Sequence, residues 1–212
     1  MKKETLKELD NLIYFTKDSL KSLSGDSDNT ISMNIHRWKK SGDIIVFKSG
    51  IYTTKKSYEI NSKEEGYHKY ISSILLKPSY ISLSTTLSGY DILSEGVYNT
   101  FAVTTKLPTS YFGRKYIYRQ VTDKLFLGYE VKYFKDEKHE YYEATKAKAL
   151  FDYIYYRSHM LDERMNIVED LRLRLDSFTK DDFEEMRYYA KIISSEKLIN
   201  IINNLEKNAY TY

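Results

Sequence analysis

The side chains best suited to specific chemistry lie in residues 30–40, TISMNIHRWKK. Arginine can donate two parallel hydrogen bonds to guanine, and serine, methionine and histidine can contact base edges or thymine methyl groups. We therefore expect base contacts from Ser32, Met33, His36 and Arg37. The expected phosphate contacts are cationic or hydroxyl side chains on and around the same segment: Thr30, Lys39, Lys40, Lys48, Ser49 and Lys55.

An amphipathic helix over residues 30–40 would present these side chains on one face. Ile31, Ile35 and Trp38 have the i, i+4, i+7 spacing of a buried stripe. At about 100° per residue, Met33 and Arg37 project away from that stripe. Such a face is often just a solvated helix surface, so its interpretation as a reading face depends on the neighbouring elements.

The residues before this helix predict two earlier helices and a polar turn. Apolar spacing of three and four indicates a helix over residues 5–14, and Thr16 can cap a second helix that ends at Ser24-Gly25. In the turn that follows, Asp28 or Asn29 fits the N-cap of the third helix. Asp26 and Asp28 would alternatively suit a magnesium ion, but no strand, phosphate loop or distant third carboxylate accompanies them.

A small hairpin is expected after the third helix. Gly42 suits the left-handed position that ends a helix, and residues 44–47 and 51–54 are β-prone runs joined by Lys48-Ser49-Gly50. Helix, turn, helix and hairpin in this order are typical of a winged helix-turn-helix, which binds duplex DNA. We assign residues 1–60 to it, and place Lys48 at the tip of the wing.

Residues 61–212 are expected to form a second, α+β domain. The fold class predicted for the chain is thus α+β, an N-terminal winged helix-turn-helix followed by a mixed α/β domain with C-terminal helices. The expected strands are residues 97–104, 116–121 and 125–134. The expected helices are residues 67–76, one capped at Ser79 or Ser82, 145–156, 162–175, 179–193 and 195–204.

A second basic surface is predicted within this domain. Tyrosines at 111, 116 and 118 interleave with its cations, a combination that binds single-stranded or structured nucleic acid by stacking and charge. An ordinary half-buried strand with basic outer positions fits the alternation equally well. The cations concerned are Lys106, Arg114, Lys115, Arg119 and Lys124. Asp152, on an aromatic helix, is expected to satisfy a local hydrogen bond.

Composition limits the remaining chemistry. The 212 residues contain no cysteine and four scattered histidines, so no metal site or cofactor is expected. There is no signal-peptide layout and no apolar run of about 20 residues, which predicts a cytoplasmic protein without membrane contact. The net charge of +3 is small, so DNA affinity would need a local basic patch. Without a nucleophile elbow or a phosphate loop, an enzyme is not expected.

Four segments resemble the AbiEi antitoxins of bacterial abortive-infection systems: RWKKSGDIIVFKSGIYTT, KPSYISLSTTLSGYDILSEG, YNTFAVTTK and AKALFDYIYYR. KPSYISL followed by a helix of small residues is the most specific of them. The resemblance covers most of the first 157 residues. One departure is Ala147 before Lys148, where members tend to carry an acidic residue.

The resemblance implies a winged-helix autorepressor of a type IV toxin-antitoxin operon. Such a protein binds double-stranded operator DNA and counteracts a nucleotidyltransferase toxin without a stable complex. An alternative from the residues alone is a protein-interaction module in which the winged helix docks a protein. A nucleotide-processing enzyme is a third interpretation, and it would require a divalent metal.

Overall fold

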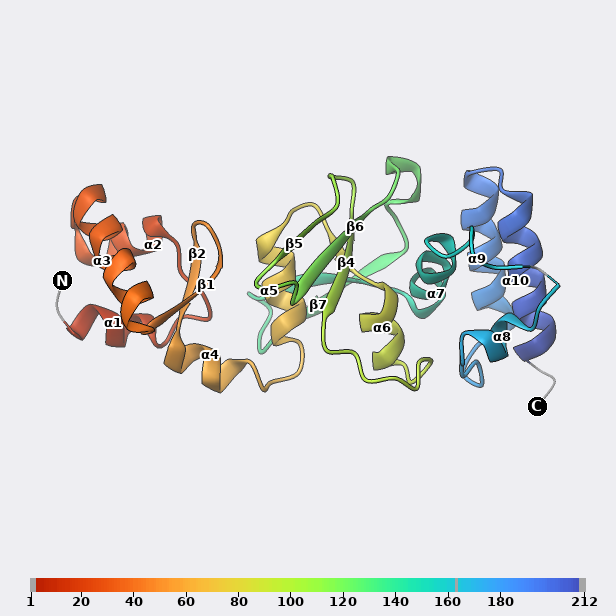
Figure 1. The fold of residues 1–212 in the computed structure, drawn as a ribbon, viewed down its shortest axis with the longest axis horizontal. Coiled ribbons are helices and arrows are strands. Elements are labelled where there is room, and N and C mark those ends of the chain that lie inside the picture. The colour runs from red at the N-terminus through yellow and green to blue at the C-terminus, as the bar shows by residue number, and fades with distance from the viewer. Residues whose placement is uncertain (1–2, 163, 210–212) are drawn as a thin grey trace.

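The computed structural model describes residues 3–162 and 164–209, a mixed α+β chain with helices at both ends of a sheet (Figure 1). The N-terminal part contains three helices and a hairpin, in the order expected. The helices are α1 (Lys3–Leu9), α2 (Lys17–Ser24) and α3 (Asp28–Ser41), and the strands are β1 (Ile44–Lys48) and β2 (Ile51–Thr54). Their core joins Ile31 and Ile35 of α3 to Leu9, Phe15 and Leu20.

Local capping agrees with the sequence at three of four positions. Thr16 caps α2 by accepting from the Ser19 amide at 3.2 Å. Gly25 and Gly42 end α2 and α3 with φ of 66° and 77°, a conformation that costs glycine no Cβ clash. The cap of α3 is Ser27, not Asp28 or Asn29, because Ser27 has the extended backbone that lets its Oγ accept from the Thr30 amide.

The first helix is shorter than predicted. α1 ends at Leu9, whereas its apolar pattern continues to residue 14. The reason is a pairing distant in sequence: the Phe15 amide donates to the Tyr52 carbonyl at 2.7 Å, and the Tyr52 amide returns a bond at 3.0 Å. The chain must be extended at Phe15 to make this bridge, so helical geometry stops before it.

The middle of the chain is a six-stranded mixed sheet in the order β5-β6-β4-β3-β8-β7. β3 runs parallel to β8 and β4 parallel to β6, while the other neighbours are antiparallel. The strands are β3 (Tyr80–Ile81), β4 (Thr100–Thr104), β5 (Thr109–Tyr111), β6 (Tyr116–Gln120), β7 (Tyr129–Tyr133) and β8 (Glu140–Ala144). β3, β5 and β8 were not predicted, and a short 3₁₀ turn, η1 (Asp123–Leu125), precedes β7.

Two separate cores cover the two faces of this sheet. Ile81 and Ala102 pack with α5 (Tyr67–Leu75), whereas their chain neighbours Tyr80 and Val103 pack on the opposite face. That opposite face is covered by α6 (Leu83–Gly89) and α7 (Lys146–Tyr155). Successive side chains along a strand point to opposite faces of the sheet. A sheet that is covered on both sides therefore needs apolar residues at both the odd and the even positions of its strands.

The C-terminal helices differ from prediction in one segment. Only α8 (Ile167–Asp170) forms within the helix expected over residues 162–175, of which residue 163 lies outside the described part. Leu173 bridges to Leu93, and the Arg174 amide donates to the Ile92 carbonyl at 2.9 Å, which holds the segment extended. The two last helices agree with expectation: α9 (Lys180–Ile192) and a longer α10 (Glu196–Ala209).

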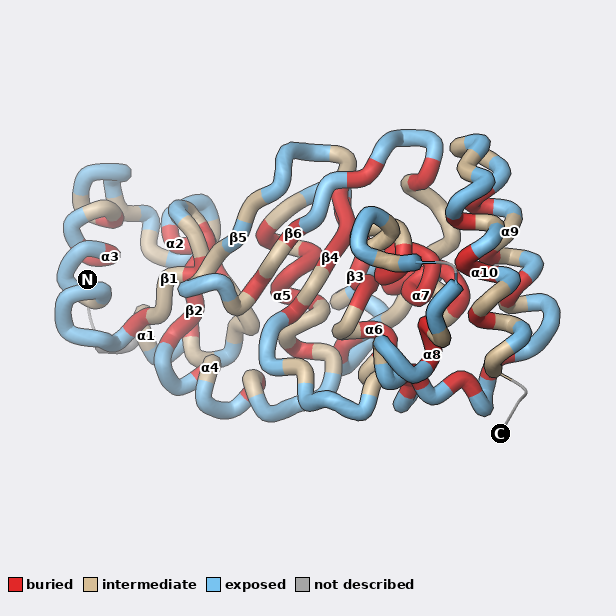
Figure 2. Tube along the Cα trace, turned by 45° about the vertical axis from the view of Figure 1, so that its right-hand side comes forward, coloured by how far each residue is buried: buried red, intermediate tan, exposed pale blue. Residues whose placement is uncertain are grey.

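The predicted boundary near residue 60 does not separate the packing. Phe47 and Ile51 of the hairpin share one core with Tyr67 of α5 and Tyr116 of β6, and α4 (Lys55–Asn61) follows β2 directly. The hairpin therefore rests against the sheet. α3 lies at the opposite end of the molecule from α9 and α10 (Figures 1 and 2). Among the described residues, no helix has the length and apolarity that crossing a bilayer requires.

Candidate nucleic-acid interface

The outer face of α3 carries the predicted base-contacting residues at one end of the molecule. Met33 is 63% exposed, and His36, Arg37 and Lys40 are also exposed. Opposite them on the helix, Ile31 and Ile35 are buried in the N-terminal core. We call Met33, His36, Arg37 and Lys40 the α3 outer face. None of its cationic side chains forms an ion pair with a described residue.

Arg37 is oriented by a buried neighbour, Asn34, that no pattern along the chain singled out. Its guanidinium donates to Oδ1 of Asn34, a residue only 1% exposed, one helical turn earlier. The Asn34 amide nitrogen has no hydrogen-bond partner in the described structure. Asn34 therefore anchors one terminal nitrogen of the guanidinium, while the remaining N–H groups of Arg37 stay available to a ligand.

Ser32 lies at the border of this face and brings in a cation from another helix. Its hydroxyl donates to the Asp28 carbonyl at 2.8 Å and accepts from Nζ of Lys17 at 3.1 Å. Lys17, in the first turn of α2, thus stands beside the N-terminal half of α3, a position that spacing along the chain could not reveal. Thr30, expected on phosphate, hydrogen-bonds the hydroxyl of its cap residue Ser27 at 3.0 Å.

The two aspartates of the turn are not gathered around a cation site. Asp28 pairs with Lys21 at 2.9 Å, and this hydrogen bond lowers the pKa of Asp28 and raises that of Lys21. Asp26 is half-buried, with its Oδ2 atom unpartnered among the described residues. No cluster of three or more potential metal ligands occurs in the part of the chain described.

The hairpin tip corrects the expectation for Lys48. Its Nζ donates to the Leu75 carbonyl at the end of α5 and lies 5.3 Å from the centre of the Tyr111 ring. Burial, together with the charge of Lys106, lowers the pKa of Lys48. The tip packs on the sheet because Phe47 inserts among its aromatic rings, 5.4 Å from Phe112. Lys48 is thus held by the protein itself rather than presented to a phosphate.

The other expected phosphate contacts are exposed but unequal in their surroundings. Lys39 and Lys40 extend the α3 outer face toward the C-terminus of the helix. Ser49 is exposed beside Gly50, whose φ of 89° makes the hairpin turn. Lys55 begins α4, after the β1–β2 hairpin, and pairs with Glu59 at 3.9 Å.

The second basic surface is not a stacking platform. Tyr116 and Tyr118 are at most 1% exposed, and they hydrogen-bond His68 and Ser72 below the sheet. Lys115 precedes β6 and donates to the Tyr98 carbonyl at 2.5 Å. The remaining cations, Lys106, Arg114, Arg119 and Lys124, are exposed and lie on loops or strand ends. The interpretation of an ordinary strand with inward tyrosines fits this arrangement.

A buried polar cluster lies where two segments of the resemblance meet. Lys148 and Asp152, one turn apart on α7, are both fully buried, and Nζ donates to Oδ1 at 2.5 Å. The other carboxylate oxygen accepts from Ser82 at 2.7 Å and from Tyr80 at 3.0 Å. Burial raises the pKa of Asp152, opposed by these three donors.

The surroundings of Lys148 leave no room for solvent. Its Nζ lies 5.1 Å from the ring centre of Tyr189 and 5.6 Å from that of Tyr80. Gly128, at φ of 78°, closes the site: a Cβ there would stand 2.1 Å from the Tyr189 hydroxyl. The cluster therefore links β3, α7 and α9 inside the protein. The expectation for Asp152, a satisfied carboxylate, is confirmed.

Sequence reasoning missed Lys148 as a partner, although a signal was present. Lysine and aspartate four residues apart on an otherwise apolar helix form a neutralising pair, which is the condition under which both can be buried.

A comparison with protein-family models finds no match, and a comparison with curated proteins finds none either.

Proposed function

We propose that the protein is a DNA-binding transcriptional repressor in which α1–α3 and the β1–β2 hairpin act as a winged helix-turn-helix. The observation that carries this proposal is the α3 outer face, an unpaired basic surface at the tip of the molecule. A helix of 14 residues is about 21 Å long, and the major groove, about 12 Å wide, admits one helix. α3 would enter the groove with Arg37 directed at a base.

Contacts to the phosphates would come from both flanks of α3. The N-terminal half offers backbone amides near Ser27, assisted by Lys17, and a helix N-terminus attracts anions. The C-terminal half offers Lys39 and Lys40. Lys48 takes no part in this arrangement, so affinity would depend on α3 more than in a module with a free wing.

The regulatory role, as an autorepressor and antitoxin of a type IV operon, rests on the four segments that resemble AbiEi antitoxins. Repression would follow from steric occlusion of the protein's own promoter. The functional partner would be a nucleotidyltransferase toxin, counteracted without a stable complex. A nucleotidyltransferase gene directly downstream is expected, and its absence would remove the antitoxin part while leaving DNA binding intact.

The direct test is a binding titration of the full chain against duplex from upstream of its own gene. Specific complexes are usually at least about 10³-fold tighter than complexes with unrelated duplex. Arg37→Ala should reduce this preference, whereas Arg164→Ala, at an exposed position outside α1–β2, should leave it unchanged. Equal affinity for unrelated duplex of the same length would overturn sequence-specific repression.

A second candidate, a protein-docking module, is favoured by the position of the hairpin tip. With Lys48 and Phe47 engaged by the sheet, the wing cannot swing toward a groove independently of the rest of the chain. In that case α3 would contact a protein surface instead. Pull-down of the neighbouring gene product that is abolished by Arg37→Ala, without any duplex binding, would establish this function in place of repression.

A further inference from the structure

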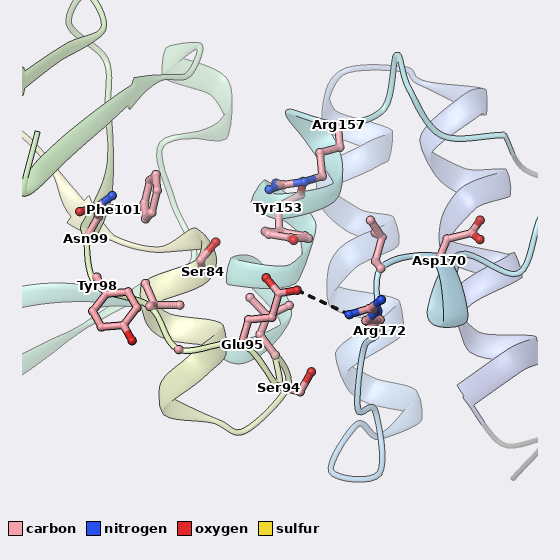
Figure 3. A pocket seen from close by; sticks show the side chains of 14 residues that line it. Ser84, Ser94, Glu95, Tyr98, Asn99, Phe101, Tyr153, Arg157, Asp170 and Arg172 are labelled. Atoms are coloured by element: carbon pink, nitrogen blue, oxygen red, sulfur yellow. Dashed lines mark hydrogen bonds and ion pairs between the residues drawn. The ribbon is translucent and has the colours of Figure 1, made fainter.

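A pocket of about 580 Å³ opens between the sheet domain and the C-terminal helices, remote from α3. Its walls come from Ser84 of α6, the loop of residues 93–99, Phe101 of β4, the end of α7 with the turn after it, and residues 170–172 at the end of α8 (Figure 3). Pockets of 300–1,000 Å³ are the size that small ligands occupy. Nothing in the proposed DNA-binding function uses this site.

The inner wall of the pocket carries Tyr153, a largely buried side chain whose hydroxyl is accessible from the pocket. Tyr153 is 9% exposed, and its hydroxyl makes no hydrogen bond with any residue that the structure describes. In Figure 3 the Tyr153 ring is drawn between the side chains of Arg157 and Glu95. Because this hydroxyl is accessible and has no protein partner, it can donate a hydrogen bond to a ligand atom or accept one from it.

Arg157 supplies an uncompensated charge beside that hydroxyl. Its guanidinium carbon lies 3.5 Å above the centre of the Tyr153 ring, and one nitrogen donates to the Tyr153 carbonyl at 3.3 Å. No described carboxylate pairs with Arg157. Stacking fixes the plane of the guanidinium, and its remaining N–H groups present the planar fork that recognises phosphate or carboxylate.

The rim of the pocket is polar and adaptable. Arg172 and Glu95 approach at 4.0 Å, with side chains 77% and 79% exposed, and an ion pair this open contributes little. Both side chains can turn toward a ligand. Phe101 and Tyr98, the latter 85% exposed, line the sheet side of the pocket and offer aromatic faces.

We propose that this pocket binds a nucleoside monophosphate group, either as a free nucleotide or as the 5′-phosphorylated end of a nucleic-acid strand. Arg157 and the Tyr153 hydroxyl hold the phosphate, and the planar base stacks on Phe101 or Tyr98. Arg172 and Glu95 provide a donor and an acceptor for the edge of the base. The combination of one anchored guanidinium, one free hydroxyl and nearby aromatic faces selects an anion that carries a flat ring.

The test is calorimetric titration of the full chain with AMP, adenosine, inorganic phosphate and a 5′-phosphorylated oligonucleotide. AMP or the phosphorylated oligonucleotide should bind, and each should bind at least tenfold more tightly than adenosine or its unphosphorylated counterpart. Binding of the oligonucleotide alone assigns the strand end as the source of the phosphate. Binding of neither, or equal binding of adenosine and AMP, overturns the proposal.

Variants separate the pocket from other cationic surfaces. Arg157→Gln should weaken nucleotide binding at least tenfold, and Tyr153→Phe, which removes only the hydroxyl, several-fold. The matched controls are Arg174→Gln, an exposed arginine outside the pocket, and Tyr155→Phe on the same helix. Circular dichroism establishes that each variant is folded, so unchanged binding by folded Arg157→Gln contradicts the assignment.

Discussion

The α3 outer face and the buried cluster of α7 use the same side-chain types in opposite surroundings. On α3, Arg37 and Lys40 are exposed and have no carboxylate partner in the described chain. On α7, Lys148 and Asp152 are fully buried and satisfy each other. A cation left in water is available to an external anion, whereas a buried one is already committed to its internal partner. Charge alone therefore does not mark a binding site.

The largest effect is expected inside the cluster. Lys148→Ala leaves the Asp152 carboxylate buried and uncompensated, which should lower the free energy of unfolding by about 3–5 kcal/mol in urea denaturation. Lys40→Ala, on the α3 outer face, should stay within about 0.5 kcal/mol. The double variant Lys148→Met with Asp152→Leu should recover part of the loss. A Lys148→Ala protein as stable as Lys40→Ala would erase the distinction between the two regions.

The next effect concerns DNA affinity as well as stability. Arg37→Ala should weaken binding to the operator by about 1–3 kcal/mol, measured by fluorescence anisotropy, because a bidentate base contact is lost. Urea denaturation should also show a loss of about 1–3 kcal/mol, because the buried Asn34 Oδ1 loses its hydrogen-bond donor. Asn34→Ala tests whether the buried amide orients Arg37: it should reduce the preference for operator over unrelated duplex. If Arg37→Ala binds operator normally, α3 is not the reading helix.

His68, a half-buried histidine on α5, should make the free energy of unfolding depend on pH. Burial, together with Lys115, lowers the pKa of His68 from 6.5 to about 4. Between those values the unfolded chain binds a proton that the folded chain does not, so stability falls as the pH drops from about 6.5 to 4. The expected loss is about 1–2 kcal/mol, reduced because the ring is half-buried. His68→Gln should flatten this slope in urea denaturation followed against pH, whereas exposed His36→Gln should keep it.

The smallest effect distinguishes Lys40 from Lys48, two of the lysines expected to contact phosphate. Lys40→Ala should reduce the slope of log affinity against log salt concentration by about one, as for one lost phosphate contact. Lys48→Ala should leave that slope unchanged and lower stability by about 1 kcal/mol, because it removes a hydrogen bond to the Leu75 carbonyl. A lower salt slope in Lys48→Ala would return the hairpin tip to the DNA interface.

Local sequence patterns were sufficient to predict the elements that are stabilised by residues close together in the chain. The stripe of Ile31 and Ile35, the Thr16 cap and the glycines at 25 and 42 each act within one or two turns of helix, and each behaves as its pattern predicts. The outward direction of Met33 and Arg37 follows from the same periodicity. Composition and spacing likewise located the helices α5, α7 and α9 and the two strands of the hairpin.

Long-range contacts decided the rest. Phe15 is extended because Tyr52, 37 positions later, supplies its bridge partner, and residues 171–174 are not helical because Ile92 and Leu93 pair with them. Lys48 points at α5 because Phe47 packs in an aromatic core there. Lys148 is buried because Asp152 neutralises its charge, while Tyr80 and Ser82 donate hydrogen bonds to the other oxygen of that carboxylate. Periodicity along the chain sets which side chains share a face. Only the tertiary structure determines which residues pack against that face, because the free energy of each such contact depends on a residue distant in sequence, which a local pattern does not identify.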